Sequence, residues 1–274
     1  MPLFTIDPET CHRDGLCVAD CPLGLIRLSA DDPTPVPIAD ADDLCIRCGH
    51  CVAVCPHGAF HHREIPPASL PPVDRDRLPS ADAVTHLFQT RRSVRRYRSQ
   101  IVDDETLAGL IDIARHAPSG HNSQPVHWLV IREPSEVNRL AGMVVDWMRH
   151  LLSEAPDMAR SYLMDAIVDE WEAGRDRVCR HAPHLILAHG PQDNPTAPAA
   201  CTIALTHIDL AAPTVGLGTC WAGYLQIAAT QWEPLRAALA PPDGHAVFGA
   251  LMIGRPAVRY HRIPPRRAAR IIWR

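Results

Sequence analysis

The chain has 274 residues, which is enough for one ordinary domain and a small additional module. Its hydrophobic content of 46% and charged content of 21% are typical of globular proteins. A formal net charge of −4 excludes a strong general attraction to nucleic acid or to an anionic membrane, and no apolar run approaches the length of a membrane span. The amino-terminal segment lacks the basic and apolar regions of a secretory signal, so we expect a cytoplasmic protein.

Seven of the ten cysteines lie before residue 56, in two copies of one pattern. The second copy, Cys45-Ile-Arg-Cys48-Gly-His-Cys51-Val-Ala-Val-Cys55-Pro56, is a complete C-x2-C-x2-C-x3-C-P run, the spacing typical of cubane iron–sulfur clusters. The first copy, Cys11 to Pro22, carries Asp14 where the repeat requires its second cysteine. A zinc site or disulfides are the alternatives, but zinc sites use two separated cysteine pairs.

The two copies together resemble the two-cluster bacterial ferredoxins. The resemblance implies that Cys21, Cys45, Cys48 and Cys51 hold one [4Fe–4S] cluster, while Cys11, Cys17 and Cys55 hold the other with Asp14 at its fourth corner. Because a carboxylate is a harder donor than a thiolate, the second cluster could be a [4Fe–4S] cluster with an aspartate ligand or a [3Fe–4S] cluster. Asp14 could equally be a solvated loop carboxylate. We expect this ferredoxin-like domain to span residues 1–63, with short strands near 3–6 and 25–28.

Residues 64–80 are too rich in proline for a helix or a central strand and predict an extended linker. In the following domain, residues 81–274, Ser80 is expected to cap a helix over 81–89 with an apolar stripe of Val84, Leu87 and Phe88. Further helical patterns cover 103–116, 135–179 with a break at Pro156, and 198–215 with a distortion at Pro213. Buried strands are expected over 126–131, 185–188 and 247–253. The pattern predicts an α+β fold.

Four segments of this second domain are far apart in the sequence and form one specific pattern when taken together. They are Arg91-Arg-Ser-Val-Arg95, Ala117-Pro-Ser-Gly-His-Asn-Ser-Gln-Pro125, Gly216-Leu-Gly-Thr-Cys-Trp-Ala-Gly223, and Ile253-Gly-Arg-Pro256 with Pro264-Pro-Arg-Arg267. In this order they resemble the nitroreductase family of FMN-dependent flavoproteins. The resemblance covers the chain from Leu87 onward. It implies helices around a central mixed or antiparallel sheet, and a homodimer in which two chains complete each flavin pocket.

The resemblance also implies individual flavin contacts. Guanidinium groups bind phosphate oxygens bidentately, the 117–125 loop reaches the flavin from the second subunit, and small residues in the 216–223 segment let the backbone approach the ring. The expected cofactor-binding residues are Arg91, Arg92, Ser93, Arg95, Pro118, Ser119, Asn122, Cys220, Trp221, Ala222, Gly223 and Arg266. Cys220 fits a buried thiol better than a nucleophile. His121 or His127 could supply a proton to the substrate, although the family typically needs no dedicated acid.

These features together predict an oxidoreductase. An external donor, ferredoxin-like or nicotinamide, would reduce the clusters, and electrons would pass singly to FMN. The reduced flavin would deliver two-electron equivalents to a small organic acceptor, which the family resemblance implies is a nitroaromatic, a quinone or an activated double bond. Two alternatives remain open: an electron relay to a partner protein, and a redox sensor in which Asp14 marks a labile cluster.

Overall fold

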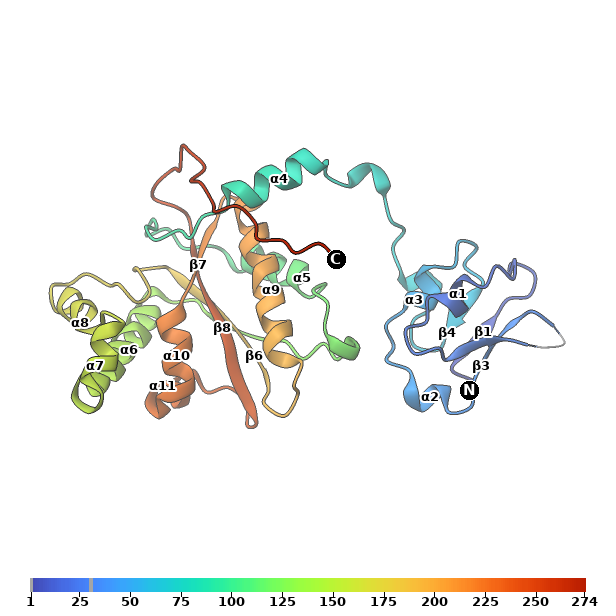
Figure 1. Cartoon of the computed structure of the whole chain (residues 1–274), viewed down its shortest axis with the longest axis horizontal. Coiled ribbons are helices and arrows are strands. Elements are labelled where there is room, and N and C mark those ends of the chain that lie inside the picture. The colour runs from blue at the N-terminus through green and yellow to red at the C-terminus, as the bar shows by residue number, and fades with distance from the viewer. Residues whose placement is uncertain (1, 30–31) are drawn as a thin grey trace. The chain divides into compact units, whose positions relative to one another are not determined.

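The computed structural model describes residues 2–29 and 32–274, and the chain falls into two compact units (Figure 1). One unit contains the chain up to Leu78 together with His121–Ser123, and the other contains Pro79–Gly120 and Gln124–Arg274. Most of the proline-rich stretch therefore groups with the first unit, where it forms two short turns, η1 (Pro67–Ser69) and η2 (Arg75–Arg77). No helix in the described part of the chain is long and apolar enough to cross a bilayer.

The first unit is built from short strands and single-turn helices. Strand β1 (Phe4–Ile6) pairs antiparallel with β4 (Phe60–His62), and β2 (Ile26–Leu28) pairs antiparallel with β3 (Pro35–Pro37). The helices are α1 (Leu16–Ala19), α2 (Ala41–Leu44) and α3 (His50–Ala53). The small core contains Phe4 and Phe60, whose ring centroids are 4.5 Å apart, and buried Val52. The strands expected near 3–6 and 25–28 are confirmed.

The sequence repeat is also a repeat of backbone conformation. Gly15 and Gly49 precede α1 and α3 with φ angles of 72° and 76°, a left-handed conformation that glycine adopts without steric cost. Two residues earlier in each copy, Arg13 and Arg47 are left-handed as well, with φ angles of 57° and 51°. Because arginine has a Cβ atom, this conformation is disfavoured and requires support from its surroundings.

The second unit has a four-stranded antiparallel sheet in the order β5 (His127–Ile131), β6 (His184–Pro191), β8 (His245–Gly254), β7 (Gly218–Trp221). Both faces are covered. Along β6, Leu185 and Leu187 pack against α6 (Pro134–Glu154), α10 (Gly223–Gln231) and α11 (Glu233–Leu239). Ile186 and Ala188 face α5 (Asp104–Ala114) and α9 (Ala197–Ala211) on the opposite side. The predicted α+β class is confirmed, with a sheet that is antiparallel throughout.

Local sequence signals mark several helix ends. The Ser80 hydroxyl accepts a hydrogen bond from the Ala83 N–H at 3.2 Å, at the start of α4 (Ala81–Thr90). The predicted helical region 135–179 consists of α6, α7 (Pro156–Ser161) and α8 (Met164–Glu172), and it ends earlier than expected, just before Gly174 at a φ of 77°. Helix α9 ends at Ala211 and continues as the 3-10 turn η4 (Ala212–Val215), the distortion expected from Pro213. Strand β7 and helices α10 and α11 were not expected.

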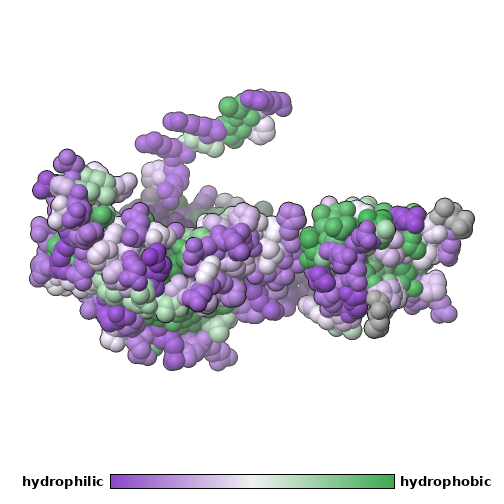
Figure 2. All heavy atoms as spheres, turned by 90° about the horizontal axis from the view of Figure 1, so that it is seen from below, coloured by the Kyte–Doolittle hydropathy of each residue, from purple (hydrophilic) through white to green (hydrophobic). Residues whose placement is uncertain are grey.

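The apolar stripe predicted on α4 is not part of the core. No residue of this helix is buried, and Val84 and Phe88 are 37% and 57% exposed. Hydrophobic residues also gather on the surface of the first unit (Figure 2), where Leu16, Leu23 and Leu44 are exposed. The helical period of α4 was therefore predicted, but not the environment of its apolar side.

Candidate functional site

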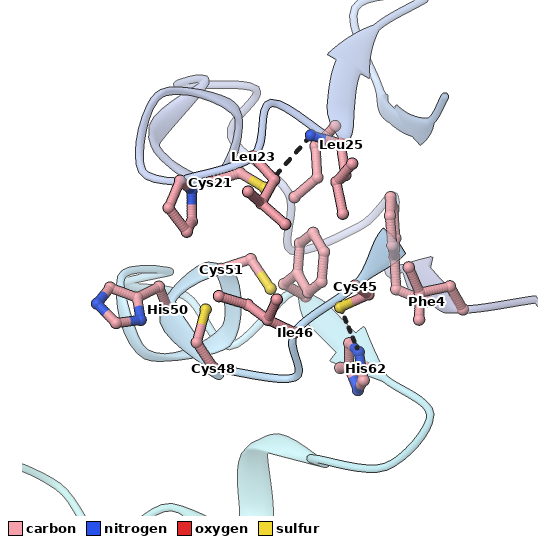
Figure 3. Close-up of a pocket in the computed structure, with 14 residues that line it drawn as sticks. Phe4, Cys21, Leu23, Leu25, Cys45, Ile46, Cys48, His50, Cys51 and His62 are labelled. Carbon is pink, nitrogen blue, oxygen red and sulfur yellow. Dashed lines mark hydrogen bonds between the residues drawn. The ribbon is translucent and has the colours of Figure 1, made fainter. Parts of the chain in front are cut away.

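Two hollows in the first unit are each lined by one of the predicted cysteine sets. The first is lined by Cys21, Cys45, Cys48 and Cys51, with Phe4 and His62 among the residues around them (Figure 3). Cys21 follows α1 in the first copy of the repeat, whereas the other three cysteines belong to the second copy. The fold therefore brings the last cysteine of one copy to the three cysteines of the other.

The second hollow has the reciprocal composition. It is lined by Cys11, Asp14, Cys17 and Cys55, so Asp14 takes the position that Cys48 has in the first hollow. One oxygen of Asp14, Oδ1, accepts a hydrogen bond from the Leu16 N–H at 3.1 Å. This bond orients the carboxylate at the wall of the hollow.

Each set has the donor types of an iron–sulfur cluster, with four cysteines around the first hollow and three cysteines with one carboxylate around the second. In a cluster each iron takes a single protein ligand, so the four donors surround the whole cluster and do not meet at one point. In the described residues no three His, Cys, Asp or Glu side chains converge as they would around one metal ion. The structure pairs none of the ten cysteines in a disulfide.

Backbone and side-chain N–H groups lie close to the sulfurs of the first hollow. The Leu25 N–H donates to Cys21 Sγ at 3.3 Å, and the Arg47 N–H donates to Cys45 Sγ at 3.4 Å. His62 Nε2 is 3.7 Å from Cys45 Sγ (Figure 3). Hydrogen bonds to ligating sulfurs stabilise negative charge and raise the reduction potential of a cluster. Burial raises the pKa of the Cys51 thiol to about 12, so metal binding at this thiol must release a proton.

The Arg91–Arg95 segment follows α4 in the chain and lies beside the edge strand β7, where the Val94 N–H donates to the Thr219 carbonyl at 2.8 Å. Arg91 Nη1 lies 3.4 Å from Oδ2 of Asp209, a buried carboxylate on α9. Asp209 also accepts a hydrogen bond from the Thr219 hydroxyl. The buried carboxylate thus holds the first arginine of the segment in place.

Four of the predicted flavin residues line one cleft of about 320 Å³. Arg95, Cys220, Trp221 and Gly223 come from the Arg91–Arg95 segment, β7 and the start of α10. Cys220 is buried, as expected for a structural thiol, and burial raises its pKa. Among the neighbouring predicted residues, Ala222 is buried, and Arg91, Arg92 and Ser93 are partly buried.

Sequence reasoning missed two arginines of this cleft, Arg177 and Arg180, in the loop between α8 and β6. Both also line an adjoining hollow of about 380 Å³, together with Arg95. The pKa of Arg180 is lowered, first by burial and then by the positive charges of Arg177 and Arg95. Clustered positive charge at a partly buried position favours an anionic ligand. The run of three arginines from Arg175 to Arg180 was the sequence signal for this feature.

The remaining predicted flavin residues are not at this cleft in the single chain. The Ser119 hydroxyl accepts a hydrogen bond from the Gln124 N–H at 2.9 Å. Pro118 is exposed in the same loop, and Arg266 is exposed after the end of β8. Asn122 belongs to the first unit, where its side-chain amide donates to the carbonyls of Ile46 and Arg47, each at 3.1 Å. Roles for these residues in flavin binding stay predictions.

The two candidate proton donors do not line the cleft either. His121 is exposed and left-handed, with a φ of 52°. His127 lies at the start of β5 beside two other histidines, with its ring centroid 4.8 Å from that of His245 and 5.5 Å from that of His189. The structure adds no support to a proton-donor role for either residue.

Comparison with known proteins matches two parts of the chain to two families. Residues 9–60 match the family described as a 4Fe-4S dicluster domain, and residues 88–255 match the nitroreductase family. The 5,6-dimethylbenzimidazole synthase of Rhodospirillum rubrum is 30% identical over 191 residues, which cover 67% of this chain and 86% of that protein. The NADH dehydrogenase of Thermus thermophilus is 28% identical over 211 residues, covering 72% and 98% of the two chains.

A solved structure has the same fold as the second unit. The nitroreductase with bound FMN from Bacteroides fragilis superposes with a TM-score of 0.55 at 21% identity, covering 69% of this chain and 98% of that one. The nitroreductase match alone extends over more than half of the 274 residues. The chain is therefore a member of the nitroreductase family, an oxidoreductase that carries a 4Fe-4S dicluster domain before its family fold.

Proposed function

We propose that this chain binds two iron–sulfur clusters and FMN, and that it transfers electrons from an external donor to a small organic acceptor. The observation that carries the proposal is the pair of hollows, each lined by one complete ligand set, in a member of the nitroreductase family. When bound, the clusters supply one-electron transfer and FMN supplies two-electron reduction. The acceptor classes that fit are nitroaromatics, quinones and activated double bonds.

The residues around the first hollow would hold a [4Fe–4S] cluster. Those around the second would hold either a [4Fe–4S] cluster with Asp14 as its fourth ligand or a [3Fe–4S] cluster without it. The first form is supported by the position of Asp14 in the lining of this hollow, where the Leu16 N–H orients its carboxylate.

FMN would bind along Arg95, Cys220, Trp221 and Gly223, with its phosphate held by guanidinium groups that include Arg91. The buried Asp209 orients Arg91, and the positive charges at the cleft would stabilise negative charge on the bound cofactor. The FMN in the Bacteroides fragilis nitroreductase supports this choice of cofactor.

A homodimer is part of the proposal, since several large apolar side chains of the second unit lack cover within the chain. Phe88 is 57% exposed, and Ile272 and Trp273 are 83% and 87% exposed. Burial of such side chains between two copies would remove apolar surface from water. The donor would be a nicotinamide, as the name of the Thermus thermophilus relative suggests, or a ferredoxin-like protein. We place the protein in the cytoplasm, where thiols stay reduced.

The proposal is tested by anaerobic purification or reconstitution, followed by assays of iron, acid-labile sulfide and flavin per chain. About seven or eight iron atoms and one FMN are expected. Acceptor reduction is then followed with NADH and with reduced ferredoxin as donors. With reduced ferredoxin, Cys48→Ser, which removes a proposed cluster ligand, should slow acceptor reduction while FMN content stays unchanged. Protein that binds no flavin, or a Cys48→Ser variant that reduces acceptor from ferredoxin at the wild-type rate, would contradict the proposed electron path.

A further inference from the structure

One side chain from outside the cysteine repeat holds the loop between two cluster cysteines. The amide nitrogen of Asn122 donates to the carbonyls of Ile46 and Arg47, each at 3.1 Å. Both carbonyls lie between Cys45 and Cys48, and Ile46 lines the first hollow with these cysteines. One amide group therefore determines the orientation of two consecutive peptide groups next to the proposed cluster.

The backbone on both sides of this contact has a disfavoured conformation. His121, Asn122 and Gln124 have φ angles of 52°, 51° and 43°, and Arg47 on the opposite side has a φ of 51°. Residues with a Cβ atom keep left-handed angles only where the surrounding structure holds them. Three of the four residues in this segment therefore depend on their surroundings, which include the contact of Asn122 with the cysteine loop.

The other copy of the repeat is an internal comparison. Its loop from Cys11 to Asp14 has the same backbone turn, with Arg13 at a φ of 57°. Arg13 forms an ion pair with Asp32 at 3.3 Å. Within residues 2–29 and 32–274, no side-chain amide donates to the carbonyls of His12 and Arg13. The turn therefore forms without such a contact, and Asn122 distinguishes the copy with four cysteines from the copy with Asp14.

We propose that Asn122 is a positioning residue for the cluster held by Cys21, Cys45, Cys48 and Cys51, and that it raises the reduction potential of this cluster. Its amide holds the 46–47 peptide groups so that the Arg47 N–H stays directed at Cys45 Sγ, at 3.4 Å. It also places the positive end of its own dipole beside the loop. Both effects stabilise the added negative charge of the reduced cluster.

This inference rests on the proposed binding of clusters and FMN, and it makes that function more specific. Asn122 lies in the 117–125 loop, which the family resemblance assigns to flavin binding. The inference names one of the two proposed clusters, the one whose cysteine loop accepts hydrogen bonds from Asn122.

The test uses the full-length protein with its clusters and FMN. Asn122→Ala removes the two hydrogen bonds, and Asn122→Asp replaces the donor by a carboxylate of the same shape. Asn138, exposed on α6, provides the matched controls Asn138→Ala and Asn138→Asp. Each cluster is titrated under a controlled potential and followed by electron paramagnetic resonance, with the signal of the first hollow identified by its loss in Cys48→Ser. Flavin content is measured by absorbance.

The midpoint potential of this cluster should be lower in Asn122→Ala than in the wild type, and lower again in Asn122→Asp. The signal of the Asp14 cluster in the Asn122 variants, and both cluster potentials in the Asn138 variants, should remain unchanged. Unchanged potentials in both Asn122 variants would overturn the inference, and so would loss of FMN from Asn122→Ala with an unaltered cluster signal. The measurement of midpoint potentials needs no acceptor. A protein that reduces no organic compound would therefore disprove the proposed acceptor chemistry, whereas the lowered cluster potentials of the two Asn122 variants would still support the role of Asn122.

Discussion

Replacement of Arg91 by alanine tests both its proposed contact with the FMN phosphate and its ion pair with buried Asp209. At the 3.4 Å separation of Arg91 Nη1 and Asp209 Oδ2, two unit charges attract each other by about 5 kcal/mol at an effective dielectric constant near 20. The Arg91 side chain is 24% exposed, and the cost of desolvating both charged groups offsets part of the attraction. We therefore expect Arg91→Ala to lower the free energy of unfolding by about 2–3 kcal/mol, because Asp209 is left buried without its cation.

The double variant separates stability from cofactor binding. In Arg91→Ala with Asp209→Asn no buried charge remains, and the asparagine can still accept a hydrogen bond from the Thr219 hydroxyl. The free energy of unfolding of the double variant should be higher than that of Arg91→Ala by at least about 1 kcal/mol. Its FMN affinity should stay about 10–100-fold below that of the wild type, because the phosphate still lacks a charged ligand. The control is Arg115→Ala, which breaks an ion pair with Asp112 in which both side chains are 67% exposed, and it should cost less than about 1 kcal/mol.

Urea unfolding followed by tryptophan fluorescence is the suitable stability assay, since all six tryptophans lie in the second unit and report on it alone. FMN affinity is measured by quenching of flavin fluorescence on the flavin-free protein. If the double variant is no more stable than Arg91→Ala, the buried carboxylate is not the source of the destabilisation. If Arg91→Ala binds FMN with wild-type affinity, Arg91 does not hold the phosphate.

Three further predictions concern other parts of the chain. His184 is buried between the Val102 N–H and the Arg132 carbonyl, and burial lowers its pKa, so the unfolded chain binds a proton at a higher pH than the folded protein does. The free energy of unfolding should therefore be highest above pH ~6.5 and fall at lower pH, and His184→Gln should reduce this fall in urea midpoints measured from pH 5 to 7. A Cβ atom on Gly218 would lie 2.4 Å from Val94 Cγ2, so Gly218→Ala should lower the free energy of unfolding by about 1–3 kcal/mol. The control Gly109→Ala places its Cβ atom in open space on α5 and should raise the free energy of unfolding by about 0.5–1 kcal/mol, and equal effects of the two variants would contradict the packing at β7. Asp14→Cys should leave the signal of the first hollow unchanged and, if the wild-type site holds a [3Fe–4S] cluster, raise the iron content by about one atom per chain.

Much of the chemistry was predictable from short-range sequence, because it depends on residues close together in the chain. The cysteine spacing, Gly15 and Gly49 determine two similar loops, and the structure contains both with the same backbone angles. The Ser80 cap, the break at Pro156 and the distortion at Pro213 were predictable for the same reason: each acts on hydrogen bonds within one turn.

The sequence by itself also determined the periodic pattern of α4 and the order of the four flavin-like segments. Only the tertiary structure decided that the apolar side of α4 lies outside the core, because a hydrophobic period does not specify what covers it. Three other features likewise join residues that are distant in the chain. They are the ion pair of Arg91 with Asp209, the position of Arg177 and Arg180 at the cleft, and the contact of Asn122 with the Cys45–Cys48 loop. Such contacts depend on how helices and strands pack, since no local rule relates an amide at position 122 to carbonyls at positions 46 and 47.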